Sequence, residues 1–240
     1  MPADQETSSS TRRSRGSRRR PDLPEPRVEK IPPRSGLSRA EVLANQRARI
    51  FDGLAAALAY HGYEDTKITD IVELSGVSRA TFYEHFESKE LCFTAAYEDG
   101  AEGLVAAVED SVPDERSWAN QLSAGLWAGL SFLASNPLLA HLLLVESLAA
   151  ARPARLEHER SLERLAEALR PPSSDGQVGE SVSEETARML AGGLASYLSG
   201  RVLAGETERL PELHDLMLQY LLAPSLAALR TTDERRATAL

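Results

Sequence analysis

The sequence contains little cysteine, few aromatic residues and no long apolar run. One residue of 240, Cys92, is a cysteine, and 5% of the residues are aromatic. A single cysteine cannot form an internal disulfide, which excludes a disulfide-stapled secreted domain. The apolar stretch from Leu138 to Ala150 is interrupted by Glu146 and is too short to cross a bilayer. The N-terminus also lacks the apolar segment of a secretory signal, so we expect a cytoplasmic protein.

Motifs of the common enzymes and metal sites are missing as well. The chain has no Gly-x-Ser-x-Gly elbow, no phosphate-binding glycine loop and no His-Glu-x-x-His pair. Its five histidines, among them the one in His158-Glu159, lack metal-ligand spacing. The sequence therefore predicts no catalytic residue, no metal and no cofactor, and it favours a binding function.

A helix-turn-helix pattern occupies residues 66–90. A short apolar stripe predicts the first helix, and Gly76 supplies the left-handed residue that a sharp helix end needs. Ser78 is a good N-cap for the second helix, on which Phe82 and Phe86 recur at helical spacing and face inward. The residues that this leaves exposed around the start of the second helix are Arg79, Ala80, Thr81, Tyr83 and Glu84.

The order and spacing of these residues resemble the DNA-binding domain of the TetR family of bacterial transcriptional regulators. The similarity runs from about Ala44 to Phe93. It includes Gly62-Tyr63 at the end of a long first helix, Gly76-Val77-Ser78 at the turn and Thr81-Phe82-Tyr83 after it. A lone Gly-Val-Ser is weak evidence, whereas this ordered set is specific. The alternative is a three-helix module that only packs, which would leave exposed polar side chains without a purpose.

The resemblance implies a recognition helix from Ser78 to His85 that lies in the major groove of DNA. Arg79, Ala80 and Thr81 are implied to contact bases, and arginine prefers guanine O6 and N7. The resemblance assigns Ser78, Tyr83 and Lys89 to phosphates. It assigns Thr66 and Thr69 to further contacts with the DNA backbone. The full implied set is Thr66, Thr69, Ser78, Arg79, Ala80, Thr81, Tyr83, His85 and Lys89. The resemblance further implies a homodimer on a palindromic operator, since paired recognition helices about one DNA turn apart match two half-sites.

Charge is divided unevenly along the chain. The formal net charge is −9, yet residues 1–36 carry nine Lys/Arg against five Asp/Glu, whereas residues 37–92 carry six against nine. The segment 1–36 has too little apolar content to fold alone, which predicts a disordered basic tail. Two interpretations of this tail stay open, an arm that contacts DNA and a solvated extension without function.

Helices are predicted on both sides of the motif, and no segment alternates as a strand does. A Ser38–Glu41 capping box opens the preceding helix, Gly62 ends it, and Ser88 caps the helix that follows the motif. Residues 171–180, rich in Pro, Ser and Gly, are expected to form a mobile loop. The later helices are expected at about 115–134, 137–150, 154–169, 183–204 and 211–222.

The helix that follows Ser183 carries small residues at every fourth position, which lets another helix approach closely. The resemblance places the last two long helices at a subunit interface, and close packing within one subunit is the alternative. The stripe consists of Gly192, Ser196, Gly200 and Ala204.

A pocket for a small hydrophobic or amphipathic effector, of unknown identity, is implied in the C-terminal half. Glu146 or His141 is the expected polar anchor, and ordinary core packing is the alternative for every member of the set. The residues expected to line the pocket are Trp118, Trp127, Phe132, His141, Glu146 and Tyr197.

Together these patterns predict an all-α protein with an N-terminal three-helix helix-turn-helix DNA-binding domain and a C-terminal helical bundle for ligand binding and dimerisation. The expected boundaries are a basic tail at 1–36, the DNA-binding domain at 37–88, the regulatory domain at 89–230 and a disordered tail at 231–240. The predicted function is a ligand-responsive transcriptional regulator, with repression favoured over activation. The competing hypothesis is a helical adaptor that uses the motif for protein contact.

Overall fold

The computed structural model describes residues 36, 38–112, 117–150, 152–170 and 182–224, and every regular element among them is helical. This confirms the predicted all-α fold. Most of the basic tail, the loop predicted at 171–180 and the C-terminal tail lie outside the described residues.

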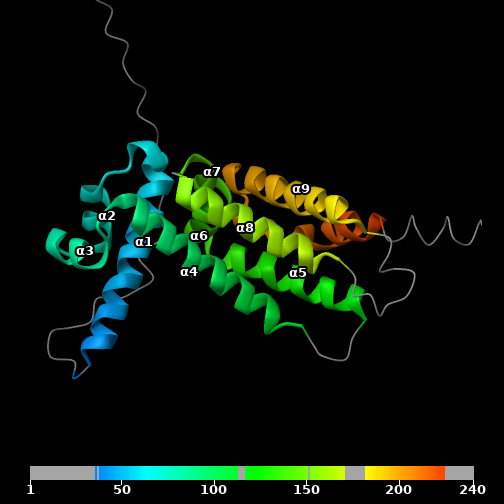
Figure 1. The fold of residues 1–240 in the computed structure, drawn as a ribbon, viewed down its shortest axis with the longest axis horizontal. Helices are drawn as coiled ribbons and strands as arrows, with labels where there is room; N and C mark the ends of the chain where they lie inside the picture. The colour runs from blue at the N-terminus through cyan, green and yellow to red at the C-terminus, as the bar shows by residue number, and fades with distance from the viewer. Residues whose placement is uncertain (1–35, 37, 113–116, 151, 171–181, 225–240) are drawn as a thin grey trace, which may run out of the picture.

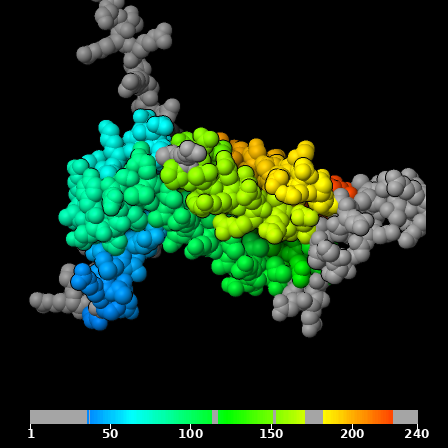
Figure 2. All heavy atoms as spheres, viewed as in Figure 1, coloured from blue at the N-terminus to red at the C-terminus, as the bar shows by residue number. Residues whose placement is uncertain are grey.

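Two groups of helices are joined by α4 (Lys89–Glu109), as Figure 1 shows. The N-terminal group contains α1 (Arg39–Asp65), α2 (Ile68–Ser75) and α3 (Arg79–His85). The first turns of α1 project from the body of the molecule (Figure 2).

The C-terminal group is a bundle in which α4 packs against α5 and α8, and α8 packs against α9. One continuous set of buried apolar side chains runs through both groups. The elements of the bundle are α5 (Trp118–Ser135), α6 (Pro137–His141), the π-helical turn η1 (Leu142–Glu146), α7 (Ser147–Ala149), α8 (Arg152–Ala168), α9 (Glu184–Leu203), the 3-10 helix η3 (Thr207–Leu213) and helical residues 214–224.

The helix caps predicted in the N-terminal group and at the start of α4 are confirmed. Ser38 and Glu41 form the capping box, Gly76 is left-handed with φ 61°, and Ser88 accepts the N–H of Leu91. Gly62 also breaks the α-helical backbone, with φ 73°, although the last turn of α1 continues beyond it.

Two helices of the C-terminal group differ from the prediction. The segment expected as one helix from residue 137 to 150 contains the π turn η1. The helix expected from Pro211 begins at residue 214 instead, and Pro211 lies inside η3. Proline has no N–H to continue an α-helical ladder, so the chain forms the tighter 3-10 helix first.

Within the described residues, no single helix is both long and apolar enough to cross a bilayer. Only α5 and the segment Pro137–Ala149 reach that length together, and they are bent by 107° at their break.

The arrangement of the N-terminal group depends on a close approach of α1 to α2 at Gly53. A β-carbon at this position would lie 2.7 Å from the backbone nitrogen of Ser75 and 2.8 Å from the carbonyl oxygen of Ile71. These are backbone atoms, which cannot rotate away as a flexible side chain can. Only glycine therefore allows the two helices to meet in this position.

We expect Gly53→Ala to lower the free energy of unfolding by about 1 to 3 kcal/mol, because overpacking here displaces a helix backbone. The control is Gly129→Ala in α5, where the nearest atom, on Val108, would be 3.5 Å from the new β-carbon. The free energy of unfolding of that variant should equal or exceed that of the wild type, because alanine has a higher helix propensity than glycine. Urea titration followed by circular dichroism measures both, and equal stabilities would contradict the close approach.

Candidate nucleic-acid interface

The turn between α2 and α3 is fixed by a buried cation. The side chain of Arg49, on α1, donates to the carbonyl oxygen of Ser75 over 2.5 Å. This carbonyl is in the last residue of α2, where the helix dipole favours positive charge. Gly76 then takes the left-handed conformation, and Ser78 caps α3 by accepting the N–H of Thr81 at 3.0 Å.

The helix α3 has one buried face and one exposed face. Phe82 is fully buried and Phe86 is 6% exposed, as predicted. Arg79 lies 3.5 Å from the hydroxyl oxygen of Tyr83 and 5.7 Å from the centre of its ring. Tyr83 is 45% exposed, so the pair lies along the outer surface of α3. The residues exposed on this face are Arg79, Ala80, Tyr83 and Glu84.

The remaining residues assigned to DNA have different environments. Thr69 is exposed and Thr81 is half-buried. The ring of His85 contacts Gln46 of α1 through Nε2 at 3.2 Å, so this histidine also helps to join α3 to α1.

Thr66 is placed differently from the prediction. It is 2% exposed, and its hydroxyl donates to the carbonyl oxygen of Gly62 over 2.7 Å. The resemblance assigned Thr66 to DNA, which requires an exposed hydroxyl. In the structure Thr66 is the C-cap of α1, and α2 begins two residues later, at Ile68. Its hydroxyl is therefore occupied inside the fold.

Lys89 is half-buried and also has partners inside the fold. Its ammonium donates to the carbonyl oxygens of Tyr63 and Thr66, over 2.6 Å and 3.0 Å. The cation therefore stabilises the C-terminal end of α1, where carbonyl groups lack helical partners.

A shallow groove brings these N-terminal residues together. It lies where the start of α2 meets the start of α4, and Arg79 of α3 borders it. Lys67 belongs to this groove and was missed by the sequence analysis. A lysine just before a predicted helix start was the available signal. The lining residues are Thr66, Lys67, Ile68, Thr69, Arg79, Glu87, Ser88, Lys89 and Glu90.

The six side chains expected around an effector pocket lie in several environments. Tyr197 is 46% exposed on α9, and the 53%-exposed Trp127 has its ring 5.7 Å from that of His214. Phe132 packs against α4, where a β-carbon on Gly103 would lie 3.3 Å from its ring. Two of these three side chains are therefore exposed, which differs from the enclosed lining of a typical pocket.

The other three members of the set are more enclosed. Trp118 is buried at the start of α5. His141 and Glu146 face one another, with Nδ1 and Oε1 3.7 Å apart. Burial lowers the pKa of His141 and raises that of Glu146, while the backbone N–H of Tyr63 opposes the latter shift. This pair is where the structure brings predicted effector residues together.

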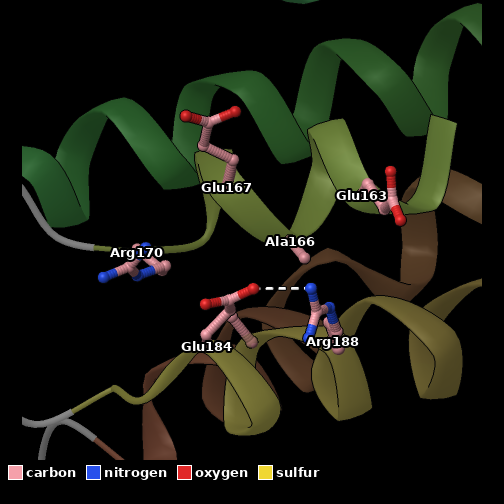
Figure 3. A pocket seen from close by; sticks show the side chains of 7 residues that line it. Glu163, Ala166, Glu167, Arg170, Glu184 and Arg188 are labelled. Carbon is pink, nitrogen blue, oxygen red and sulfur yellow. Dashed lines mark ion pairs between the residues drawn. The ribbon is translucent and has the colours of Figure 1, made fainter. Parts of the chain in front are cut away.

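A second groove lies between α8 and α9 (Figure 3). Glu163 and Glu167 project from α8, and Glu184 forms an ion pair with Arg188 on α9. The lining of mixed charge differs from the mostly apolar lining of a typical small-molecule pocket. The groove is therefore a weaker candidate for the effector site than the His141–Glu146 pair.

The small-residue stripe on α9 faces outward. Ser196, Gly200 and Ala204 are exposed, and Gly192 is half-buried. A β-carbon on Gly192 or Gly200 would meet no atom within 4 Å. This argues against close packing of the stripe within one subunit.

Large apolar side chains flank the stripe and continue onto the final helical segment. They are exposed, whereas most large apolar side chains among the described residues are buried or half-buried. The exposed members are Met189, Tyr197, Leu203, Leu216 and Tyr220. We call this surface, together with the stripe, the α9 face.

Redox and metal chemistry have little support in the described part of the chain. Cys92 is fully buried, and burial raises the pKa of its thiol to about 12. A thiol with such a pKa stays protonated and unreactive at neutral pH. Among the described residues, no group of three or more His, Cys, Asp and Glu side chains could hold a metal ion.

The segment that contains the helix-turn-helix matches a family of regulators in sequence. Residues 50–96 match the family described as "Bacterial regulatory proteins, tetR family". An HTH-type transcriptional repressor of Mycobacterium tuberculosis is 31% identical over 32% of this chain and 46% of its own length. The HTH-type transcriptional repressor AcnR of Corynebacterium efficiens is also 31% identical, over 28% of this chain and 36% of its own. The chain thus spans less than half the length of these relatives.

The overall fold resembles solved regulator structures over about three quarters of the chain. The fatty acid degradation regulator FadR from Bacillus halodurans has a TM-score of 0.64 and 21% identity, covering 74% of this chain and 94% of its own. FadR from Bacillus subtilis in complex with stearoyl-CoA has a TM-score of 0.62 and 20% identity, covering 73% and 97%. At this identity the likeness concerns the fold. The segment 50–96, which contains the helix-turn-helix, therefore matches the tetR family of bacterial regulatory proteins.

Proposed function

We propose that this protein is a cytoplasmic transcriptional repressor that binds a palindromic DNA operator as a homodimer and releases it when a small effector binds the C-terminal domain. The observation that carries the proposal is the exposed face of α3, which presents Arg79, Ala80 and Tyr83 beside a capped helix start. Two relatives named as transcriptional repressors are each 31% identical to part of this chain, which supports the same function.

In the proposed complex, the start of α3 enters the major groove. Arg79 contacts a base edge, while Ser78 and Tyr83 contact phosphates. Lys67 and Thr69, which are exposed at the start of α2, add backbone contacts from the adjoining groove. The acidic total charge does not oppose this docking, since phosphate attraction depends on the local charge distribution.

The dimer is proposed to form through the α9 face. Exposed apolar patches rimmed by polar residues commonly mark protein interfaces. A two-fold copy of the same face would cover the stripe and hold two α3 helices at a fixed spacing. An effector that favours another spacing would then release DNA by shifting the population away from the binding state.

The direct test is selection of random duplexes with the purified full-length protein, followed by titration of the enriched sequence and a scrambled version. We expect a palindromic sequence to bind at least about 1,000-fold more tightly than the scrambled duplex. Equal binding of both duplexes would reject the operator, and binding of neither would favour the adaptor hypothesis.

The docking predicts different effects for two residues of α3. Arg79→Ala should cost about 1 to 3 kcal/mol of operator binding and relax the preference at one base position. Tyr83→Phe should weaken operator variants alike, because a phosphate contact carries no base information. Arg209→Ala, which removes an exposed arginine paired with Glu212 in the C-terminal domain, is the control. Wild-type affinities and preferences in both α3 variants would refute this docking.

The dimer predicts that enlarging the stripe separates the subunits. A β-carbon at Gly200 meets no atom of its own protomer within 4 Å, so Gly200→Leu should preserve the fold. The free energy of dimerisation should become less favourable by about 1 to 3 kcal/mol or more. Operator affinity should fall with it. Ala168→Leu, which enlarges an exposed residue of α8, is the matched control. Dimerisation is measured by sedimentation velocity. If Gly200→Leu dimerises with wild-type affinity, the dimer interface does not include the stripe.

The basic tail, which lies mostly outside the described residues, is proposed to follow DNA phosphates. Deleting residues 1–36 should then reduce the slope of log K against log salt by about 0.9 for each phosphate that is no longer neutralised. With roughly two or three arginines engaged per subunit, the slope of a dimer becomes shallower by about 4 to 5. Ranking of operator variants should hardly change. A full-length variant whose tail arginines are replaced by glutamine should behave like the deletion, and parallel salt dependences would reject the arm.

A further inference from the structure

The backbone of Tyr63, near the end of α1, is held by one charged side chain on each side. Its N–H donates to Oε2 of Glu146 over 2.7 Å, and its carbonyl oxygen accepts from Lys89 over 2.6 Å. The ammonium of Lys89 also lies 4.4 Å from the centre of the Tyr63 ring. Hydrogen bonds to ionised groups are stronger and shorter than neutral ones. The two charges therefore fix the position of this peptide group.

The position of Tyr63 affects the rest of the N-terminal domain. Gly62 interrupts the α-helical backbone immediately before it, so the helix alone does not set the direction of the chain that follows. Lys89 also donates to the carbonyl oxygen of Thr66 at 3.0 Å, two residues before α2 begins at Ile68. A displacement of Tyr63 would therefore be passed to α2 and, through the turn, to α3.

Glu146 contacts the backbone of Tyr63 from the C-terminal domain. It is the last residue of the π turn η1, and it is only 6% exposed. The turn packs against α1, α4 and α9, which links it to the N-terminal domain and to the helix that carries the α9 face. Single π turns within helices are rare and frequently occur at functional sites.

The two oxygens of the Glu146 carboxylate face different domains. Oε2 accepts from Tyr63, whereas Oε1 lies 3.7 Å from Nδ1 of His141, too far for a hydrogen bond. That buried nitrogen has no hydrogen-bond partner among the described residues. A hydrogen-bond donor that entered between His141 and Oε1 would act on the same carboxylate that holds the N-terminal domain.

We propose that Glu146 is the positioning residue through which the C-terminal domain sets the orientation of the N-terminal domain. Movement of η1 changes the contact with Tyr63 and so changes the direction of α3. The contact between Glu146 and Tyr63 does not depend on DNA binding. The inference rests on the proposed function in one step only, that the orientation of the N-terminal domain controls operator affinity. The effector class that fits this arrangement is a small molecule with a hydrogen-bond donor directed at Oε1.

The test compares Glu146→Leu, which removes the acceptor while filling its space, with Glu146→Gln, which keeps an amide oxygen as acceptor. Spin labels on Glu84→Cys of α3 and Glu163→Cys of α8 report the orientation of the two domains within one protomer. Both positions are exposed, and the buried Cys92 is not expected to react. Labelled protein is diluted with unlabelled protein so that only distances within a protomer are measured.

We expect Glu146→Leu to shift or broaden the label distance and to weaken operator binding about 10- to 100-fold, the loss typical of one charge-assisted hydrogen bond. Glu146→Gln should keep the wild-type distance and lie within about 3-fold of wild-type affinity. A wild-type distance in a folded Glu146→Leu variant overturns the inference. If the wild type binds no operator, the proposed function fails while the label distances still decide the role of Glu146.

A second measurement does not depend on the folding of Glu146→Leu. In the wild-type protein, the amide resonance of Tyr63 should follow the titration of a carboxyl group, because its N–H is bonded to one. Glu146→Gln should abolish that pH dependence. A Tyr63 resonance that is independent of pH in the wild type, or that still titrates in Glu146→Gln, overturns the proposal.

Discussion

The structure of the N-terminal domain depends on the contact between α1 and α2 at Gly53. Because this position has no side chain, the backbone of α2 can lie against α1. One turn earlier on α1, Arg49 then reaches the C-terminal end of α2 and holds Ser75. The direction in which α3 leaves the turn follows from these contacts. Recognition of DNA by α3 would therefore depend on a residue that never touches DNA.

Two cations, one on α1 and one at the start of α4, are used in folding. Arg49 stabilises the end of α2, and Lys89 stabilises the end of α1. Each neutralises carbonyl groups that lack helical partners, and each also ties that helix end to another element. This leaves Lys67 and Arg79 as cations of the groove whose side chains remain exposed. The proposed phosphate contacts therefore rely on few local charges, which is why a basic tail would matter.

The sequence was sufficient to predict the features that depend on neighbouring residues. The caps at Ser38, Ser78 and Ser88 and the left-handed Gly76 are local, and all four are confirmed. The exposed face of α3 also followed from the spacing of its phenylalanines. The outward direction of the stripe on α9 could not be derived, because periodicity shows that residues share a face but not what that face meets.

Features that depend on distant segments were missed. The partners of Lys89 are 23 and 26 residues away, and the partner of Glu146 is 83 residues away. The π turn was also invisible in the pattern, since one inserted residue changes helical periodicity very little over such a short segment. The residues expected to line the effector pocket are divided between exposed and buried positions, for a related reason. Aromatic residues on amphipathic helices are recognised by sequence, whereas their common or separate environments are set by how the helices pack.

The hydrogen bond between Glu146 and Tyr63 also limits the coupling free energy between the two domains. If one charge-assisted hydrogen bond is made in the DNA-binding orientation and broken in another, the coupling is about 1.5 to 3 kcal/mol. That corresponds to a change in operator affinity of about 10- to 100-fold. Because binding linkage is reciprocal, operator DNA would then weaken binding of the proposed effector by the same factor. A larger response would require further contacts that differ between the two orientations, and the packing of η1 on α1 and α4 is where such contacts lie.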